Sequence, residues 1–327
     1  MQNLISISKI WNDSLDNQIN ERVAEPRDRI WASELGKADI DVYLKLMGEE
    51  VSNPFDSRAR RKFEAGNLFE WIVKIMLQRA GVYQKSQERI TQKLSAEHLM
   101  VSGYLDHLIG GTPTGVGIDD LGLPELFARA GQKILRHFQE KYPNGIPEQG
   151  IEVKSTSSFG IEKVYYTNKA LAGHDLQAFH YAYTKNIPFT LLYICRDDLR
   201  IAELPVLPDN KELFEQYEKK IASISHYYKN KQEPPKEPEI VWNEETDRFS
   251  KNFNVEYSSY LKRNYGYEKP DEYSDKWSPV TESWNRVITR IKSGKEMTAN
   301  NQEKLEQMRE MGFGSLVDSL INKYENK

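Results

Sequence analysis

Two spacings of apolar residues alternate along the chain. From 57 to 80 the apolar positions recur every three or four residues, as one face of a helix requires, and Gly81 follows as a stop signal. That face consists of Phe69, Ile72, Val73, Met76, Leu77 and Ala80. Residues 88–94 and 99–111 have the composition of strands, and the polar segment between them suits a hairpin loop. The pattern predicts a long helix followed by two strands.

The same alternation continues through the middle of the chain. We predict further helices over 123–145, 168–186 and 211–228, a strand over 150–158, and a strand pair over 188–206 that turns at Asp197 and Asp198. Helix, three strands, helix and two strands thus follow one another, with extra helices around them. This order predicts an α/β fold with a mixed central sheet flanked by helices.

The chain changes character after residue 228. Residues 229–239 are rich in proline and charge, as linkers are, and the residues up to 280 are rich in tyrosine without a clear period. The last 45 or so residues are again helical in pattern. We therefore expect a core over 1–228 with a helical insertion at about 117–148, a linker and Tyr-rich irregular segment over 229–280, and an added C-terminal helical extension over 281–327.

Composition narrows the classes of function. With 39% apolar residues, 12 Phe, 18 Tyr and 6 Trp, the chain can build a core, and its net charge of −4 excludes a generally basic nucleic-acid binder. The single cysteine, Cys195, excludes a disulfide framework and a cysteine-ligated iron–sulfur cluster supplied by this chain alone. No apolar run is long enough for a signal peptide or a membrane span, so we expect a soluble cytoplasmic protein without a membrane partner.

The predicted strand around residue 152 carries two opposite charges on one face. Because side chains alternate along a strand, Glu152 and Lys154 point the same way, with Cα atoms roughly 6.5 Å apart. A carboxylate and an ammonium group at that spacing suit a hydrated divalent cation with a phosphate beside it. A solvated, salt-bridged strand face has the same pattern, and the tripeptide taken alone favours that second interpretation.

A second carboxylate, Asp106, lies within the predicted strand 99–111. Strand alternation places it on one face with Ser102, Tyr104 and Leu108, and apolar residues adjoin it. An acidic side chain in such a run is costly unless it is compensated, and metal ligation is one form of compensation. Since Mg²⁺ is usually held by one or two carboxylates with waters and phosphates, Asp106 and Glu152 are the candidate ligands.

The segments GYLD (103–106) and EVK (152–154) together resemble the catalytic motif of the PD-(D/E)xK nuclease superfamily, in which an Asp precedes a Glu-x-Lys strand. Two further segments are similar to motifs of its RecB-like and phage (lambda-type) exonuclease branch. GNLFE (66–70) resembles a helical Gly-x-x-x-Glu/His motif, and QAFHY (177–181) resembles a Gln-x-x-x-Tyr motif. The resemblance covers roughly residues 30–205.

Two departures qualify the match. Iron–sulfur members carry a cysteine near the helix that 31–48 resembles, and this chain has none there, so it is similar to the cluster-free members. The segment between Asp106 and Glu152 is also longer than the family usually has, so the helix near 124–141 is expected to be an insertion.

The resemblance implies a restriction-endonuclease-like core and a divalent-metal-dependent deoxyribonuclease, most simply an exonuclease or DNA-end-processing enzyme of a phage or mobile element. The catalytic residues that it implies are Asp106, Glu152, Lys154, Glu70, Gln177 and Tyr181. One or two Mg²⁺ or Mn²⁺ ions would be held by Asp106, Glu152, Glu70 and the main-chain carbonyl of Val153. Lys154 would position the attacking water, and no iron–sulfur cluster is expected.

DNA contacts are expected from local groups because the net charge is negative. The candidates are Arg58, Arg60, Arg61, Ser155, Thr156, Lys163 and Lys169. The Tyr-rich residues 257–273 either stack unpaired bases or pack on the core, and packing is favoured. A recombinase or single-strand-binding protein as a partner, and a homo-oligomer, remain open. The alternative functions are a structure-specific or restriction-type endonuclease and a non-catalytic nucleic-acid-binding or packaging protein.

Overall fold

The computed structural model of the chain describes residues 24–114, 125–171, 173–244 and 246–325, together with residue 14. Its contacts divide the described residues into two compact units. The first runs up to Glu50 and from Phe55 to Pro234, and the second joins Val51–Pro54 to the chain from Pro235 onward. The Tyr-rich segment and the C-terminal helices thus fall in one unit, and the expected three-part division stays a prediction.

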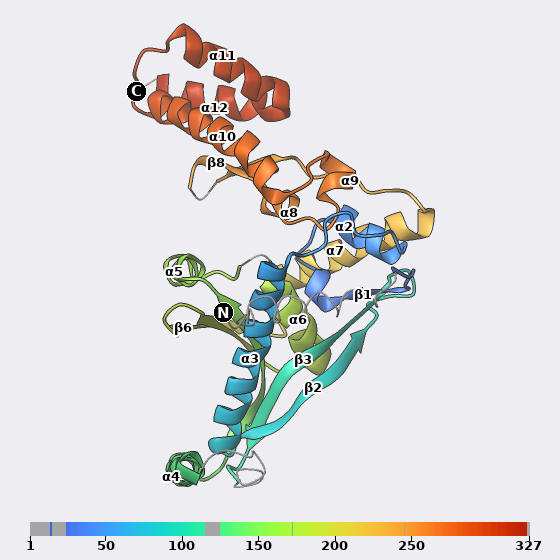
Figure 1. Ribbon diagram of the computed structural model, residues 1–327, viewed down its shortest axis with the longest axis vertical. Helices are drawn as coiled ribbons and strands as arrows, with labels where there is room; N and C mark the ends of the chain where they lie inside the picture. The colour runs from blue at the N-terminus through green and yellow to red at the C-terminus, as the bar shows by residue number, and fades with distance from the viewer. Residues whose placement is uncertain (1–13, 15–23, 115–124, 172, 245, 326–327) are drawn as a thin grey trace, which may run out of the picture. The chain divides into compact units, whose positions relative to one another are not determined.

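A mixed sheet of six strands forms the centre of the described part of the first unit (Figure 1). Its strands are β1 (Arg29–Trp31), β2 (Tyr83–Gln92), β3 (Met100–Gly111), β4 (Ile146–Thr156), β5 (Phe189–Cys195) and β6 (Ile201–Val206). They follow the order β1-β3-β4-β5-β6, and β2 pairs with β3. The pairs β1–β3 and β4–β5 are parallel and the others antiparallel, so the predicted α/β fold with a mixed sheet is confirmed.

Helices cover both faces of this sheet. The helical elements of the unit are η1 (Ala32–Glu34), α2 (Asp39–Leu46), α3 (Ser57–Arg79), α4 (Glu125–Lys141), α5 (Ser158–Thr167), α6 (His174–Lys185) and α7 (Lys211–Asn230). On one face, η1, α2, α5, α6 and α7 share an apolar core with strand residues such as Leu105 and Leu191. On the other face, α3 and α4 pack against Ile109, Ile151 and Leu192. The central strand β5 is therefore buried on both faces, whereas β6 at the sheet edge alternates between exposed and buried residues.

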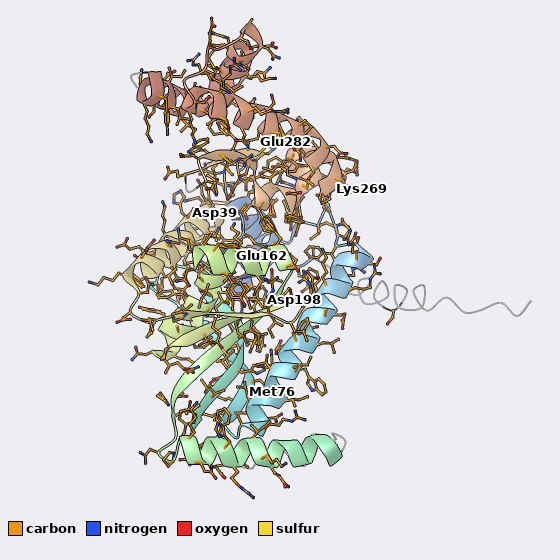
Figure 2. The ribbon with its side chains drawn as sticks, turned by 90° about the vertical axis from the view of Figure 1, so that its left-hand side faces the viewer. Asp39, Met76, Glu162, Asp198, Lys269 and Glu282 are labelled. Atoms are coloured by element: carbon orange, nitrogen blue, oxygen red, sulfur yellow. The ribbon has the colours of Figure 1, made fainter. Side chains whose placement is uncertain are left out.

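The apolar face of α3 is wider than the part that the sheet covers. Val73 is buried, and Phe69 and Leu77 are partly buried against the sheet, as predicted. Ile72 and Met76 were expected on the same buried face, but they are 47% and 49% exposed (Met76 is labelled in Figure 2). The sheet contacts only one stripe of this helix, which leaves the flanking apolar positions outside the contact.

One helix prediction was wrong in its boundaries. The helix expected over 168–186 begins at His174, and α5 occupies a stretch for which no helix was predicted. Asn168 and Gly173, with φ of +51° and +72°, end the first helix and precede the second. A residue in the left-handed region stops helical hydrogen bonding, and Asn and Gly adopt it most readily.

The side chains of β3 do not alternate along its whole length. Leu105 and Leu108 lie in the same apolar core, whereas the ring of His107 contacts α3 on the opposite face. Gln87, between the β2 residues paired with Leu105 and His107, has φ of +55°, in the left-handed region. The predicted simple alternation, with Leu105 and Leu108 on opposite faces, is therefore wrong, because the backbone is irregular at this point.

The second unit combines a two-stranded sheet with helices. Its elements are β7 (Ile240–Asn243), β8 (Arg248–Lys251), α8 (Phe253–Glu256), α9 (Leu261–Tyr265), α10 (Pro270–Lys292), α11 (Ala299–Met308), the π-helical turn η3 (Arg309–Phe313) and α12 (Gly314–Glu325), which confirms the predicted C-terminal helical region. Tyr260, Tyr273 and Trp284 are buried in this unit, whereas Tyr257 is exposed. Core packing therefore accounts for Tyr260 and Tyr273.

In the described part of the chain, no helix is both long and apolar enough to cross a bilayer. The predicted insertion at about 117–148 contains α4, and residues 115–124 at its start lie outside the described residues.

Candidate active site

Strand β3 changes its partner along one edge, and this change leaves a gap beside the middle of the strand. Residues 100–102 pair with β1 and residues 107–111 pair with β4, while β2 pairs along the opposite edge. The registers with β1 and β4 leave 103–106 without a strand neighbour on that edge. Asp106 lies at the end of the gap where β3 and β4 meet.

The Asp106 carboxylate takes the place of a backbone partner for β4. Its Oδ2 accepts a hydrogen bond from the Val153 N–H at 2.7 Å. Because the N–H and C=O of one strand residue leave on the same side, the Val153 carbonyl also faces the gap. The structure thus brings together the first of the residues that the sequence predicted to be neighbours.

Glu152 and Lys154 form an ion pair on β4 next to Asp106. The Lys154 Nζ donates to Glu152 Oε1 at 2.7 Å and to Gln177 Oε1 at 3.0 Å. Glu152 is 1% exposed, and its Oε2 has no hydrogen-bond partner among the described residues. The pair is therefore buried, which excludes the solvated strand face that the tripeptide alone favoured.

The cluster holds more negative than positive charge, because three carboxyl groups surround one lysine. Burial, and then the negative charge of Glu152, raise the pKa of Asp106 well above its usual range, and burial raises the pKa of Glu152 despite Lys154. Burial lowers the pKa of Lys154, but Glu152 and Asp106 outweigh it and the net shift is upward. Glu70 adds a third negative charge that acts on all three groups. Lys154 therefore stays charged but faces three carboxylates.

Glu70 approaches the site from α3, and β2 orients its side chain. The Gln87 Nε2 donates to Glu70 Oε1 at 2.6 Å. Burial lowers the pKa of His107 to about 4, so its ring is neutral, and its Nε2–H donates to the Glu70 main-chain oxygen at 3.1 Å. The contact from Gln87 to Glu70 was not predicted, since nothing in the neighbouring sequence indicates that this glutamine has a left-handed backbone conformation.

The glycine of the GNLFE motif, Gly66, lies where α3 passes over β4. A methyl group built on Gly66 would meet the Ser155 Oγ at 3.5 Å, which is an ordinary van der Waals contact. Packing of α3 on β4 therefore does not require a glycine at this position.

Helix α6 supplies Gln177 and Tyr181 from the other face. Gln177 accepts from Lys154 and donates through Nε2 to the Tyr181 hydroxyl at 3.4 Å. Tyr181 is 1% exposed, and burial raises its pKa, so the hydroxyl keeps its proton. A Cβ on Gly103 would lie 2.4 Å from the Tyr181 oxygen. The glycine thus lets the tyrosine approach residues 103–106 of β3, which have a strand neighbour only on the β2 side.

The histidines near these residues are held in structural contacts. Burial, and secondarily Lys154, lower the pKa of His174 to about 3, and its Nδ1 lies 3.0 Å from the Tyr193 hydroxyl. Burial lowers the pKa of His180 to about 4, and its Nδ1 lies 2.8 Å from the Tyr217 hydroxyl. Both rings are therefore neutral, and each accepts at Nδ1 if the tyrosine donates.

The predicted DNA contacts lie farther from the carboxylates. Arg58, Arg60 and Arg61 are in the first turns of α3, and Arg60 is ~15 Å from Glu70 along the helix axis at ~1.5 Å per residue. Lys163 on α5 and Lys169 beyond it are exposed.

Two hydroxyl residues follow Lys154 on β4. Ser155 accepts bonds at its main-chain oxygen and Oγ from Arg196, a residue that sequence analysis did not single out. Thr156 is 8% exposed, and its Oγ1 faces Gly160, where an added Cβ would lie 2.0 Å away. Thr156 is thus buried against α5 and offers DNA almost no surface, whereas Ser155 is partly exposed.

The residues present fit a divalent ion only as part of a mixed ligand set. Among the described residues, no group of three or more His, Cys, Asp or Glu side chains could hold a metal ion. The available donors are two carboxylates, Asp106 and Glu152, and the Val153 carbonyl, which is the set that Mg²⁺ uses when waters and phosphates complete its shell. The unpartnered Glu152 Oε2 and the shortage of positive charge also fit a cation.

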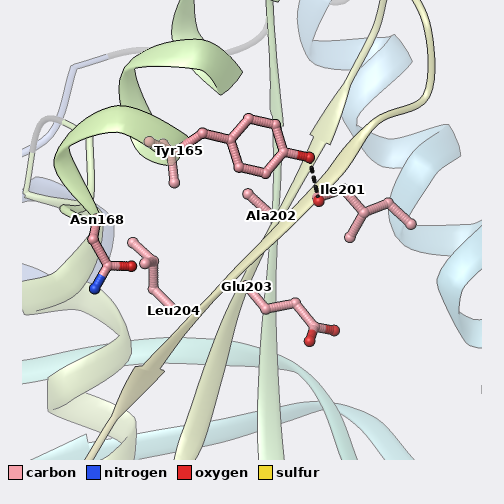
Figure 3. A pocket seen from close by; sticks show the side chains of 7 residues that line it. Tyr165, Asn168, Ile201, Ala202, Glu203 and Leu204 are labelled. Carbon is pink, nitrogen blue, oxygen red and sulfur yellow. Dashed lines mark hydrogen bonds between the residues drawn. The ribbon is translucent and has the colours of Figure 1, made fainter.

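Two surface hollows lie outside this cluster. One of about 450 Å³ is bounded by α5 and β6, and there the Tyr165 hydroxyl donates to the Ile201 carbonyl at 2.6 Å (Figure 3). The other, of about 510 Å³, is lined by residues of α10 and α11 in the second unit. Neither is lined by Asp106, Glu152 or Lys154.

Comparison with known proteins gives matches among solved structures alone. No family model and no curated protein matches the chain. The protein SSO0001 is 14% identical, with 71% of this chain and 89% of that chain covered and a TM-score of 0.42. The alkaline exonuclease LHK-Exo of Laribacter hongkongensis is 13% identical, with 68% and 97% covered and a TM-score of 0.38. LHK-Exo in complex with dAMP is 11% identical, with 68% and 93% covered and a TM-score of 0.39. Similarity at this level carries no argument about activity.

Proposed function

We propose that the chain is a divalent-metal-dependent deoxyribonuclease with a restriction-endonuclease-like core, and that it acts as an exonuclease or DNA-end-processing enzyme of a phage or mobile element. One observation carries the proposal. Glu152, buried on β4, and Asp106, half-buried on the neighbouring strand β3, lie beside one lysine, and one Glu152 oxygen lacks a partner among the described residues. Buried acidic pairs of this kind are costly unless a cation or a catalytic role compensates them.

The metal would be held by Asp106, Glu152 and the Val153 carbonyl, with Glu70 close enough to act on them electrostatically. When bound, a divalent ion lowers the pKa of a coordinated water and offsets the charge of the scissile phosphate. Lys154 contributes a fixed ammonium group next to these ligands. Because its pKa is raised, it would orient the attacking water and stabilise negative charge rather than accept a proton.

Gln177 and Tyr181 would act by positioning. Gln177 Oε1 accepts a hydrogen bond from Lys154 Nζ and so directs the ammonium group, while the Tyr181 hydroxyl accepts a hydrogen bond from Gln177 Nε2 and fixes the orientation of the amide. This chain of contacts leads from α6 to the lysine, which explains how two residues on a helix serve a site on a strand.

DNA would reach the site through phosphate contacts. Arg58, Arg60, Arg61, Lys163 and Lys169 are the proposed cationic contacts, with Ser155 as a hydroxyl contact. Such binding falls steeply with salt because it releases counterions. A recombinase or single-strand-binding partner and a homo-oligomer stay predictions.

The test uses the purified full-length protein with end-labelled linear DNA and covalently closed circular DNA, in Mg²⁺, in Mn²⁺ and in EDTA. We expect metal-dependent loss of linear DNA by the wild type, and a fall of about 10³-fold or more in Glu152→Gln and Lys154→Ala. Lys219→Ala, on the exposed side of α7, serves as the matched control and should keep full activity.

The outcomes separate the candidate functions. Cleavage of closed circles would favour the endonuclease alternative, because a strict exonuclease needs an end. DNA binding without cleavage in either metal would favour the non-catalytic alternative. Cleavage that persists in EDTA, or in Lys154→Ala, would refute the proposed site.

A further inference from the structure

One residue separates helix α5 from β4, the strand that carries Glu152 and Lys154. Two aromatic side chains of α5 point outward to solvent. Phe159 is 80% exposed and Tyr166 is 87% exposed. They are seven residues apart, which is two helical turns or ~10 Å along the axis, and Lys163 lies between them on the same face. The opposite face, with Ile161 and Val164, is buried in the core.

Neither outward ring is used in the fold of the described residues. Tyr166 has no hydrogen bond there, whereas its neighbour Tyr165 is held by the Ile201 carbonyl and lines the hollow against β6 (Figure 3). A single exposed aromatic residue is ordinary in a folded protein, but two large rings on one helix face form a surface without a partner.

The charge between the rings suits a polyanion. Lys163 is exposed and forms no ion pair in the described part of the chain. Glu162, its acidic neighbour, is 3.6 Å from Arg200, which in turn pairs with Asp198 at 2.8 Å (Glu162 and Asp198 are labelled in Figure 2). The exposed face of α5 therefore presents the ring of Phe159, the ammonium group of Lys163 and the ring of Tyr166 in that order. The negative charge of the neighbouring Glu162 is balanced by Arg200.

The face is also close to the carboxylates along the chain. Ser157 alone separates β4 from α5, and its side chain caps the helix by accepting from the Gly160 N–H. Phe159 follows Lys154 by five positions, which limits the distance between their Cα atoms to ~17 Å. About five nucleotides of one strand span that distance at ~3.4 Å each.

We propose that Phe159, Lys163 and Tyr166 form a stacking platform for unpaired nucleotides beside the catalytic strand. The rings stack on base faces, which are exposed in a single strand but covered by their neighbours in a duplex, and Lys163 contacts the backbone phosphate. The platform deepens the proposed function, on which it rests, by assigning a single-stranded stretch as the form of DNA bound next to the site.

The test measures binding of the full-length protein to a labelled 12-nucleotide oligo-dT and to a blunt duplex, in EDTA, so that no cleavage is required. Phe159→Ala and Tyr166→Ala should each weaken binding of the single strand by about 5–150-fold, the usual loss for one stacked base. Phe159→Tyr and Tyr166→Phe should stay within about 2-fold of the wild type, because they keep the ring. Lys163→Gln should reduce the slope of log affinity against log salt by about 0.7.

Matched controls isolate stacking from other effects. Phe253→Ala removes a ring that is 57% exposed in the second unit and should leave single-strand affinity unchanged. Lys219→Gln on α7 is the control for the loss of charge and should leave the salt slope unchanged. The substituted side chains are exposed, so melting temperatures should not move, and duplex affinity should change less than single-strand affinity.

The platform is refuted if the alanine variants bind the single strand as Phe253→Ala does. It is also refuted if single strand and duplex weaken equally, or if the ring-conserving variants weaken as much as alanine. Failure of the proposed nuclease function is a separate result, because it would appear as cleavage that Lys154→Ala retains while oligo-dT binding still depends on the two rings.

Discussion

The buried ion pair on β4 allows a thermodynamic test of the site that does not depend on catalysis. Replacing Lys154 by Met keeps the apolar stem but removes the ammonium group that bonds Glu152 Oε1 at 2.7 Å. Glu152, at 1% exposure, would then be a buried carboxylate without its cationic partner. Removing one member of a buried pair typically costs 3–5 kcal/mol, and since the Lys154 side chain is 20% exposed we expect about 3 kcal/mol near pH 8.

This cost must depend on pH in a defined direction. Without Lys154, the pKa of Glu152 rises further above its value of about 4.3 in the unfolded chain. A folded-state pKa above the unfolded one means that folding takes up a proton, so stability is greatest at low pH and is lost as pH rises through the folded value. The destabilisation of Lys154→Met relative to the wild type should therefore shrink between pH 8 and pH 5, by at most about 1.4 kcal/mol per pH unit.

Calorimetry in EDTA measures the effect as a fall in the Tm of the transition in which the first unit unfolds. For a unit of this size, about 3 kcal/mol corresponds to a fall of about 6–12 °C in Tm. Adding Glu152→Gln should recover about 2 kcal/mol or more, since the uncompensated charge is gone. A single variant within about 1 kcal/mol of wild type at every pH, or a double variant no more stable than the single, would refute the reasoning.

Three further outcomes follow from the same contacts. Gly103→Ala should destabilise the protein by about 1–3 kcal/mol and reduce cleavage, because its Cβ would lie 2.4 Å from the Tyr181 oxygen; urea unfolding and the linear-DNA assay check this. Gln87→Ala should be less stable than Gln87→Gly by about 1 kcal/mol in urea unfolding, since φ is +55°, and both should lose the bond to Glu70 and cleave more slowly. The Mg²⁺ concentration for half-maximal cleavage should rise as pH falls, because the raised pKa values of Asp106 and Glu152 make protons compete with the ion, and a titration at several pH values measures it.

Local pattern was enough to place much of the site. Helix α3 was predicted over 57–80 and spans Ser57–Arg79, because its apolar spacing and the glycine that follows are both local. Glu152 and Lys154 share a face as strand alternation requires, and Gln177 lies one turn before Tyr181 on α6. These relations depend on residues close together in the sequence, which is why they were predictable.

Contacts between residues on different strands or helices could not be predicted from the spacing of apolar residues. Alternation fails between Leu105 and Leu108, opposite the left-handed Gln87 of β2, and neither strand alone predicts this irregularity. The bond from Gln87 to Glu70 joins β2 to α3, and α5 was hidden because the break after Asn168 is a backbone feature. Each of these depends on tertiary contacts or on φ values, for which the sequence carried no distinct signal.

The partner change along β3 leaves an open edge beside Asp106, where the proposed metal ion would be bound. If β4 continued its pairing past His107, the Val153 N–H would bond a backbone carbonyl, and Asp106 would be a buried charge without a compensating contact. Because β1 and β4 instead leave 103–106 open, Asp106 bonds Val153 directly and Tyr181 approaches over Gly103. The same order of motifs on an unbroken sheet would therefore place these residues close together without leaving an open edge at which an ion and a phosphate could be bound.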